Sequence, residues 1–202
     1  MNEEVLERAA TAIRAGELVV YPTETVYGLG ADALDAEAVE RVFEAKGRDR
    51  SKPVSVAVPT FETAVEEGYV RASERERAFA EAFLPGPVTL LCERREPIPD
   101  VVTAGGDRVG IRVPDCEPAL EFLERAGRPV TATSANVSGE PSARRVEDIG
   151  RRVLDDAVVL EADDLYASIE ETVPSTVVDL EAETIHRRGA LADEIEAWLV
   201  EH

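Results

Sequence analysis

Residues 2–21 read NEEVLERAATAIRAGELVVY. In the first part of this stretch apolar residues recur at helical spacing, with Asn2 as an N-cap and Gly16 as a stop, which predicts a helix over residues 2–15. The run from Leu18 to Tyr21 is apolar throughout and ends at Pro22, which is typical of a short buried strand. A helix followed by a buried strand indicates an α/β fold, in which helices cover a sheet.

The same alternation continues along the rest of the chain, without an internal repeat. We therefore expect an α/β fold, a twisted mixed sheet flanked by helices, in a single domain over residues 1–202. The expected helices cover residues 35–45, 62–68, 73–83, 118–126, 146–154 and 191–199, and the expected strands cover residues 54–58, 88–92, 109–113, 130–133, 158–160, 176–180 and 184–187.

Composition excludes several classes of protein. Hydrophobic residues make up 44% of the 202 residues, enough for a packed core, and no apolar run approaches the roughly 20 residues of a membrane span. The acidic N-terminus does not resemble a signal peptide, and two cysteines give no disulfide framework. The chain has only two histidines, so the sequence does not favour a zinc site or a Ser-His-Asp triad. Walker and dinucleotide-binding motifs are absent. We expect a soluble, cytoplasmic protein without a metal site.

The charge balance is strongly acidic and almost free of lysine. Acidic residues outnumber basic ones by 42 to 22, a formal charge of −20, and Lys46 and Lys52 are the only lysines. Such a surface suits a salt-rich cytoplasm, although acidic proteins of ordinary cytoplasm share it. It disfavours generic binding to a nucleic-acid backbone. Both lysines fall in the basic window 46–53, which is either a phosphate-binding element or a solvated turn.

Several short motifs occur in a fixed order. They are YPTETVYGLG (21–30), KGR (46–48), KP (52–53), PGPVT (85–89), VGIRVP (109–114), TSANVSG (133–139) and STVVD (175–179). In this order and at these separations, over about residues 16–190, the set resembles the YrdC-like family of threonylcarbamoyl-AMP synthases. Longer members carry an extra C-terminal domain, which we expect this chain to lack.

The resemblance implies a reaction that fits the charge argument. L-threonine and bicarbonate or CO₂ would form an N-carboxylated threonine that attacks the α-phosphate of ATP, giving threonylcarbamoyl-AMP and pyrophosphate. A separate transferase complex would then modify tRNA. Direct contact between this chain and tRNA is possible, but its acidic charge does not imply it. Because the reactants are anionic or zwitterionic, we expect a cationic cavity in this acidic chain, and no membrane partner.

The resemblance also assigns residues to the reaction. Lys46 and Arg48 are implied to be catalytic, at the rim of the cavity, where they would bind ATP phosphates and stabilise charge on the α-phosphate. Mg²⁺ is expected on the triphosphate, with no protein-bound metal. The further implied ATP-binding residues are Lys52, Asn136 and Arg187, and the implied threonine-binding residues are Thr25, Arg112, which would pair with the threonine carboxylate, Ser134 and Ser175.

Each motif alone could also serve the fold without binding a ligand. Thr25 and Tyr27 could shape a turn in which Gly28 and Gly30 supply positive φ. The remaining motifs could form a helix-capping loop at residues 133–136, an edge-protecting charge at Arg112, a strand start at Ser175 and a solvated pair at Arg187 and Arg188.

Three positions depart from the family pattern. Ala57 stands near a histidine of the longer relatives, Arg108 where threonine is common, and Arg144 where serine or threonine is frequent. Two rival functions remain: an RNA-binding or ribosome-maturation factor without synthase activity, and a carbamoyl-transfer module of a larger enzyme. The pairs Lys46–Arg48 and Ser134–Asn136 favour the synthase over the first, and the absence of fused acylphosphatase-like or zinc-finger segments disfavours the second.

Overall fold

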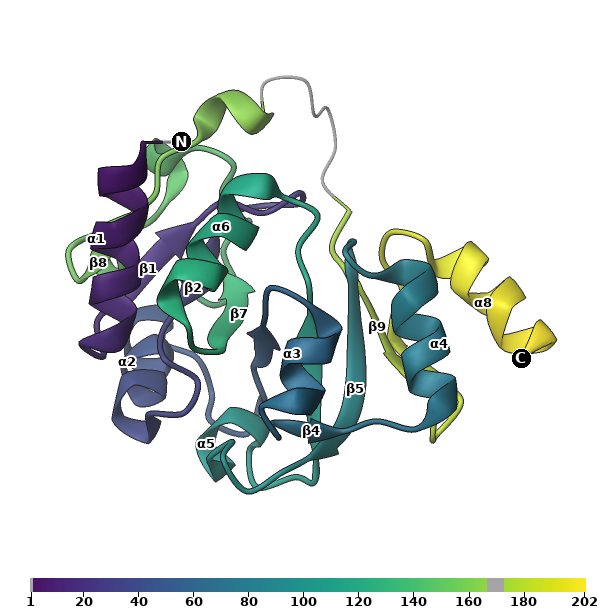
Figure 1. Ribbon diagram of the computed structural model, residues 1–202. Coiled ribbons are helices and arrows are strands. Elements are labelled where there is room, and N and C mark those ends of the chain that lie inside the picture. The colour runs from purple at the N-terminus through teal and green to yellow at the C-terminus, as the bar shows by residue number, and fades with distance from the viewer. Residues whose placement is uncertain (1, 167–172) are drawn as a thin grey trace.

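A mixed sheet forms the centre of the molecule in the computed structural model, which describes residues 2–166 and 173–202. Within these residues ten strands join one sheet, in which β4 pairs with β5 and the other strands follow the order β10-β9-β5-β6-β3-β7-β2-β1-β8 (Figure 1). The predicted α/β fold with a mixed sheet is therefore confirmed. The strands are β1 (Leu18–Tyr21), β2 (Gly28–Gly30), β3 (Ser55–Ala57), β4 (Val70–Arg71), β5 (Val88–Arg94), β6 (Arg108–Arg112), β7 (Val130–Ser134), β8 (Ala157–Val159), β9 (Thr176–Asp179) and β10 (Thr184–Arg187).

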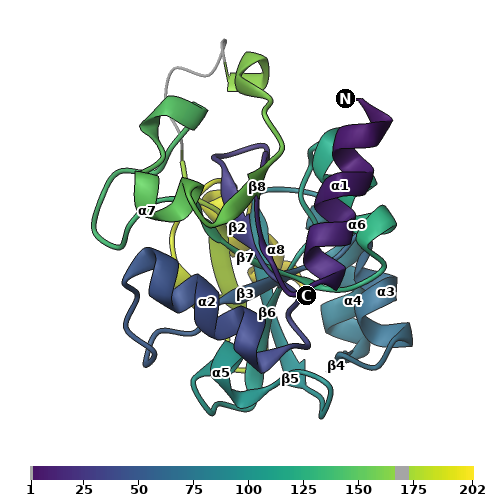
Figure 2. The same cartoon turned by 90° about the vertical axis from the view of Figure 1, so that its left-hand side faces the viewer.

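Helices pack on both faces of this sheet. In Figure 2 the sheet is seen from its β8 edge, with α1, α6, α3 and α4 on one side and α2 and α7 on the other. The helices are α1 (Glu3–Arg14), α2 (Ala36–Lys46), α3 (Phe61–Glu66), α4 (Glu74–Phe83), α5 (Asp100–Thr103), α6 (Glu117–Ala126), α7 (Arg151–Leu154) and α8 (Ala192–Glu201), with 3₁₀ turns at Val146–Asp148 and Asp163–Tyr166.

The burial of strand β1 explains why its sequence is apolar at every position. Val19 and Tyr21 pack in the core under α1 and α6, while Leu18 and Val20 pack in the core under α2. All four side chains are at most 2% exposed. A strand covered by helices on both faces needs apolar residues at every position.

The predicted N-cap of the first helix is confirmed, and the second helix is capped at both ends as well. Asn2 Oδ1 accepts a hydrogen bond from the backbone N–H of Glu4 at 3.0 Å, and Asp35 caps α2 in the same way. Helix α2 ends at Gly47, which is left-handed with φ of 59° and therefore favours glycine. This cap fixes where Lys46 and Arg48 leave the helix.

Strand β2 was missed by the sequence analysis, and it corrects the interpretation of two glycines. Neither Gly28 nor Gly30 has a positive φ; both are extended and pair with β1 and β7. A Cβ atom on Gly28 would lie 2.9 Å from Tyr21 Cζ, and one on Gly30 would lie 2.4 Å from Val130 Cγ1. These glycines are needed for close packing rather than for a turn.

The helix predicted over residues 146–154 is also wrong in part. A 3₁₀ turn and α7 are separated by extended backbone at Ile149 and Gly150. Ile149 is buried in the core, and Gly150 is a poor helix former, so the segment bends inward between two short turns. Among the described residues, no helix combines the length and apolar character needed to cross a bilayer.

Candidate active site

One face of the sheet carries a cavity of about 660 Å³. Alternate residues of β6 form part of its floor: Arg108, Gly110 and Arg112 line the cavity, whereas Val109 and Ile111 lie in the hydrophobic core on the opposite face. Strand β6 lies between β5 and β3. Arg112 is therefore inside the sheet, and the alternative that it protects a sheet edge is wrong.

The charge of the cavity lining is opposite to that of the chain. Of the described residues that line it, four are arginines and none is Asp or Glu, in a chain with 42 acidic residues. Hydroxyl groups and one imidazole provide the remaining polar surface. The arginines are Arg48, Arg108, Arg112 and Arg187; the others include Thr23, Thr25, Ser55, Thr89, Thr133, Ser134, Ser142, Ser175 and His186.

Arg112 is held by the loop between β1 and β2. Its Nη2 atom donates to Glu24 Oε1 at 2.7 Å and to Thr25 Oγ1 at 3.0 Å. The Thr25 hydroxyl lies 3.0 Å from that of Thr23, which donates to the Val26 carbonyl at 2.7 Å. The loop is thus tied to the guanidinium, and Thr25 does more than shape a turn.

Arg187 reaches the cavity from the other end of the sheet. Its Nε atom donates to the Ser175 carbonyl at 2.8 Å, and its Nη2 atom donates to the Ser175 hydroxyl at 2.7 Å. Burial lowers the pKa of Arg187, and the positive charges of Arg112 and Arg48 lower it further. Arg187 is therefore repelled by both of these arginines across the cavity, which favours an anion between them.

A β-bulge accounts for two successive residues of β10 facing the cavity. The register between β10 and β9 shifts between Ile185 and Arg187, while Ile185 packs against the core. Bulges redirect side chains that would otherwise alternate between faces. His186 and Arg187 both line the cavity as a result. Arg188 instead pairs with Asp193 and Glu196 at the surface, so the solvated-pair interpretation holds only for Arg188.

Arg48 and Lys46 take different positions, contrary to the expectation that both lie at the rim. Arg48 lines the cavity and donates to the carbonyls of Lys52 and Pro53 at 3.1 and 2.9 Å. Lys46 is 1% exposed, and its ammonium donates to the carbonyl of Ser134 and, at 2.7 Å, to that of Asn136. Burial, with the charge of Arg48, lowers the pKa of Lys46 to about 8.

Three of the predicted site residues are not part of the described cavity lining: Lys46, Lys52 and Asn136. Lys52 is exposed at the surface. The Asn136 amide donates to the carbonyls of Val137 and Glu140 at 2.9 and 2.8 Å, and its Oδ1 atom is buried without a partner. No helix starts at residues 133–136, where β7 runs to Ser134, so the capping-loop interpretation is wrong.

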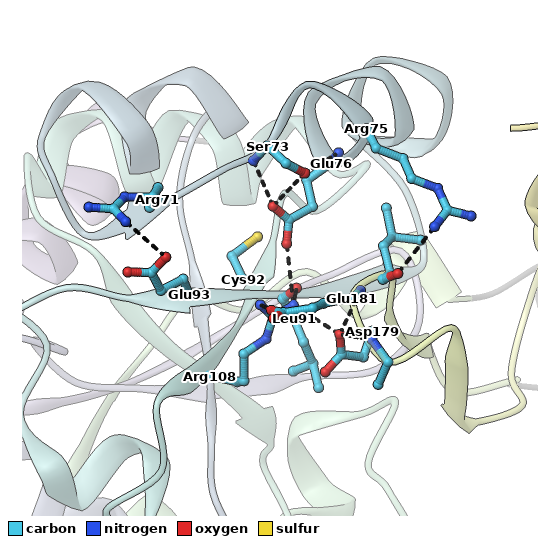
Figure 3. A network of polar contacts seen from close by, with 12 residues as sticks. Arg71, Ser73, Arg75, Glu76, Leu91, Cys92, Glu93, Arg108, Asp179 and Glu181 are labelled. Atoms are coloured by element: carbon cyan, nitrogen blue, oxygen red, sulfur yellow. Dashed lines mark hydrogen bonds and ion pairs between the residues drawn. The ribbon is translucent and has the colours of Figure 1, made fainter.

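Arg108, a position that departs from the family pattern, lies in a network of carboxylates (Figure 3). It donates to Asp179 at 2.9 Å, to Glu181 at 2.5 Å and to Glu76 at 3.3 Å, and it also donates to the Leu91 carbonyl at 2.8 Å. These contacts join β6 to β5, β9 and α4. Arg108 is therefore neutralised at one end of the cavity. Arg112 also has a carboxylate partner, Glu24, so the uncompensated positive charge of the described lining lies on Arg48 and Arg187.

The structure brings together six of the nine predicted site residues: Thr25, Arg48, Arg112, Ser134, Ser175 and Arg187. The sequence analysis did not select Ser55, Thr89 or His186, which also line the cavity. Alternation along a strand was the available signal for the first two, since Thr89 is next to the core residue Leu90. The bulge that turns His186 inward leaves no recognisable pattern in the sequence.

Known proteins resemble this chain over most of its length. It is 42% identical over 189 residues to the threonylcarbamoyl-AMP synthase of Pyrococcus abyssi (strain GE5 / Orsay), covering 89% of this chain and 52% of that protein. It is 35% identical over 191 residues to the putative threonylcarbamoyl-AMP synthase of Methanocaldococcus jannaschii, covering 92% and 86%. The crystal structure of P. abyssi Sua5 complexed with L-threonine matches with a TM-score of 0.84 and 38% identity, over 98% of this chain and 58% of that one.

The two P. abyssi comparisons leave a large part of the relative unmatched, since this chain spans about half of the 42%-identical synthase. The family comparison covers nearly all of this chain. Residues 11–189 match the Sua5/YciO/YrdC family model, described as "Telomere recombination", and the chain belongs to this family.

Proposed function

We propose that this chain is a threonylcarbamoyl-AMP synthase, which forms threonylcarbamoyl-AMP and pyrophosphate from L-threonine, bicarbonate or CO₂, and ATP. The observation that carries the proposal is the cavity lining of four arginines and no described carboxylate, in a chain of net charge −20. Every reactant except CO₂ carries a negative group, so a local excess of positive charge is needed to gather them. The relatives that bear this name support the same assignment.

The threonine end of the cavity is proposed to lie at Arg112. A guanidinium matches the two oxygens of a carboxylate, and Arg112 lines the cavity with no described acceptor on its Nη1 atom. Thr25, Ser134 and Ser175 line the same cavity and offer hydroxyl or carbonyl groups to the rest of the amino acid. The structure of a relative in complex with L-threonine supports this choice of ligand.

Arg48 and Arg187 are the proposed phosphate-binding residues. The repulsion of Arg187 by Arg48 and Arg112 is relieved when a triphosphate lies between them. We propose that Lys46 acts by fixing the carbonyls of Ser134 and Asn136, since its ammonium already binds both. Lys52, whose carbonyl accepts from Arg48, and Asn136 remain proposed ATP contacts at the same end.

The proposed chemistry needs positioning and charge rather than a dedicated base. The threonine nitrogen forms a bond to the carbon of CO₂ and releases a proton, or condenses with bicarbonate and releases water. An oxygen of the resulting carbamate attacks the α-phosphorus of ATP, and the bond to the leaving pyrophosphate breaks. Arg48 and Arg187 stabilise negative charge on the phosphates as it develops, because guanidinium groups are fixed before the reaction starts.

The donor set of the cavity does not fit a Mg²⁺ ion held by the protein. Mg²⁺ prefers carboxylate and phosphate oxygens, and the described lining offers hydroxyls but no carboxylate. The described residues also contain no group of three or more His, Cys, Asp or Glu that could hold a metal. We propose that Mg²⁺ enters with ATP, on phosphate oxygens and water.

The test is pyrophosphate release measured with each substrate left out in turn. We expect release from ATP to require both L-threonine and bicarbonate, and the adenylate product to carry the threonine carbon skeleton by mass spectrometry. ATP turnover that ignores L-threonine would overturn the proposal, and tRNA binding at high salt without ATP chemistry would favour the RNA-binding rival. A tRNA threonylcarbamoyl-transferase is the expected consumer, because an acyl-adenylate is a reactive donor.

A further inference from the structure

Glu24 lies directly behind the cavity wall, where it pairs with Arg112. The ion pair joins Glu24 Oε1 and Arg112 Nη2 at 2.7 Å, and the two side chains are 15% and 12% exposed. Arg112 lines the cavity, whereas Glu24 does not. The carboxylate therefore contacts the guanidinium in a place largely closed to water and is not itself part of the cavity lining.

This ion pair uses only part of the guanidinium. The same Nη2 atom donates to Glu24 Oε1 and to Thr25 Oγ1, whereas Arg112 Nε and Glu24 Oε2 are both buried without a hydrogen-bond partner. A buried N–H group without an acceptor is unfavourable, and it is rare in folded proteins. Glu24 and Thr25 thus fix Nη2 of Arg112, whereas no described residue accepts a hydrogen bond from Nη1, which is left for an incoming oxygen.

Glu24 also differs from the partners of Arg48 and Arg187, because it carries a negative charge. Arg48 and Arg187 bind backbone carbonyls and the Ser175 hydroxyl, and neither has a carboxylate partner among the described residues. Arg112, whose charge acts on Arg187 together with that of Arg48, is the one of these three arginines that has an ion pair among the described residues. Glu24 therefore allows a third cation to be placed in the cavity.

We propose that Glu24 is a positioning residue that holds Arg112 by Nη2, so that the remaining guanidinium donors bind the carboxylate of an α-amino acid. This inference rests on the proposed function and deepens it, because it accounts for one arginine being reserved for the amino acid while Arg48 and Arg187 face the phosphates. It also predicts that ligands without a free carboxylate do not benefit from Glu24.

The experiment compares Glu24→Gln and Glu24→Asp with Glu93→Gln, a matched control whose ion pair with Arg71 is exposed and 3.4 Å long (Figure 3). L-threonine and L-threonine methyl ester are titrated into each protein by calorimetry without ATP. KM values for L-threonine and ATP are measured separately by pyrophosphate release. Circular dichroism and thermal unfolding show whether each variant folds.

In Glu24→Gln we expect the Kd and KM for L-threonine to rise by about tenfold, with the KM for ATP changed by less than about twofold. Glu24→Asp, which keeps the carboxylate, should recover part of the affinity, and Glu93→Gln should behave as the parent. The methyl ester should bind weakly to all four proteins. If Glu24→Gln does not fold, a raised L-threonine KM in Glu24→Asp carries the same prediction.

An unchanged or tighter Kd for L-threonine in Glu24→Gln would overturn the proposal, and so would an equal rise in both KM values. Failure of the proposed function has a different signature. A parent protein that binds L-threonine but releases no pyrophosphate would end the synthase assignment, while the calorimetry would still decide the role of Glu24. A parent that neither binds L-threonine nor releases pyrophosphate would overturn both.

Discussion

Lys46 and Arg48 are two residues apart, and their side chains go to different places. Lys46 is in the last turn of α2 and points into the protein, while the left-handed Gly47 ends the helix and lets Arg48 leave with the following loop. The motif Lys46-Gly47-Arg48 identified both residues, but it could not show that one is buried against carbonyls. Side-chain direction at a helix end depends on the cap and on the element packed beside it.

Replacing Arg48 by Ala is expected to reduce pyrophosphate release by roughly tenfold to a hundredfold, the scale of losing one donor that stabilises a transition state. Arg50→Ala is the matched control, because Arg50 is in the same loop but pairs with Glu40 and Glu44 at the surface. Both rates are measured at saturating substrates. Equal rates for the two variants would show that Arg48 does not stabilise the transition state.

Lys46 gives a prediction for stability against pH. Its pKa is lowered from 10.5 to about 8 in the folded protein, so between these values the unfolded state binds more protons and stability rises with pH. From pH 8 to 10 the free energy of unfolding of the parent should rise relative to Lys46→Gln by on the order of 1–2 kcal/mol. Urea denaturation at several pH values measures this, with Lys52→Gln as the control. Parallel curves for parent and Lys46→Gln would contradict it.

At the scale of elements, the sequence predicted what depends on local periodicity. The helix before β1, the capped α2 and the buried β1 are all present, because apolar spacing and capping residues act within a few residues. Strand β2 was missed because its glycines are fixed by Tyr21 and Val130, which approach from other strands. Strand β4 is two residues long and carries no periodic signal.

The candidate site follows the same division. Arg112 and Ser134 lie in motifs of the family pattern, so the resemblance was enough to assign both of them to one site. Ser55 and Thr89 lie in the cavity only because β3 and β5 flank β6 in the sheet order, which sequence alone did not provide. The motifs therefore did not predict which strands lie side by side in the sheet, and this order decides which further residues reach the cavity.

Gly110 in β6 offers a test of the cavity floor. A Cβ atom there would lie 2.7 Å from Thr89 Cγ2 and 2.8 Å from Ser55 Oγ, so Gly110→Ala should push both side chains apart. We expect a loss of about 1–3 kcal/mol in stability and raised KM values. Gly68→Ala, at φ of 72° with nothing within 4 Å of its Cβ, should cost about 1 kcal/mol of strain and leave KM unchanged. Denaturation of both variants measures the loss of stability, and steady-state kinetics measure KM. A raised KM in Gly110→Ala alone would show that the altered cavity floor, and not lower stability, impairs binding.

At the scale of the whole molecule, negative charge covers the surface and is excluded from the described cavity lining. A net charge of −20 on 202 residues opposes compaction through self-repulsion. The surface ion pairs, such as Arg50 with Glu40, relieve little of this because exposed pairs are screened and weak. Stability should therefore depend on the ionic strength of the solution.

Raising KCl from about 0.1 M to about 2 M should increase the melting temperature, since the Debye length falls from about 10 Å to below about 3 Å. Differential scanning calorimetry across this range measures the effect, with sucrose at equal osmolality as the control for general exclusion effects. A melting temperature that is flat or falls with KCl would show that the acidic surface does not limit stability.

The cavity takes side chains from widely separated parts of the chain: Thr25 and Arg48 come early, and Ser175 and Arg187 come late. Arg187 depends on β10 pairing with β9, and β9 pairs with β5 in the interior order of the sheet. During synthesis on the ribosome, the residues of β1, β2 and α2 are made long before Arg187. The polar lining of the cavity is thus complete only when the final strands have been synthesised, so a shortened polypeptide that stops before β9 would lack Ser175 and Arg187.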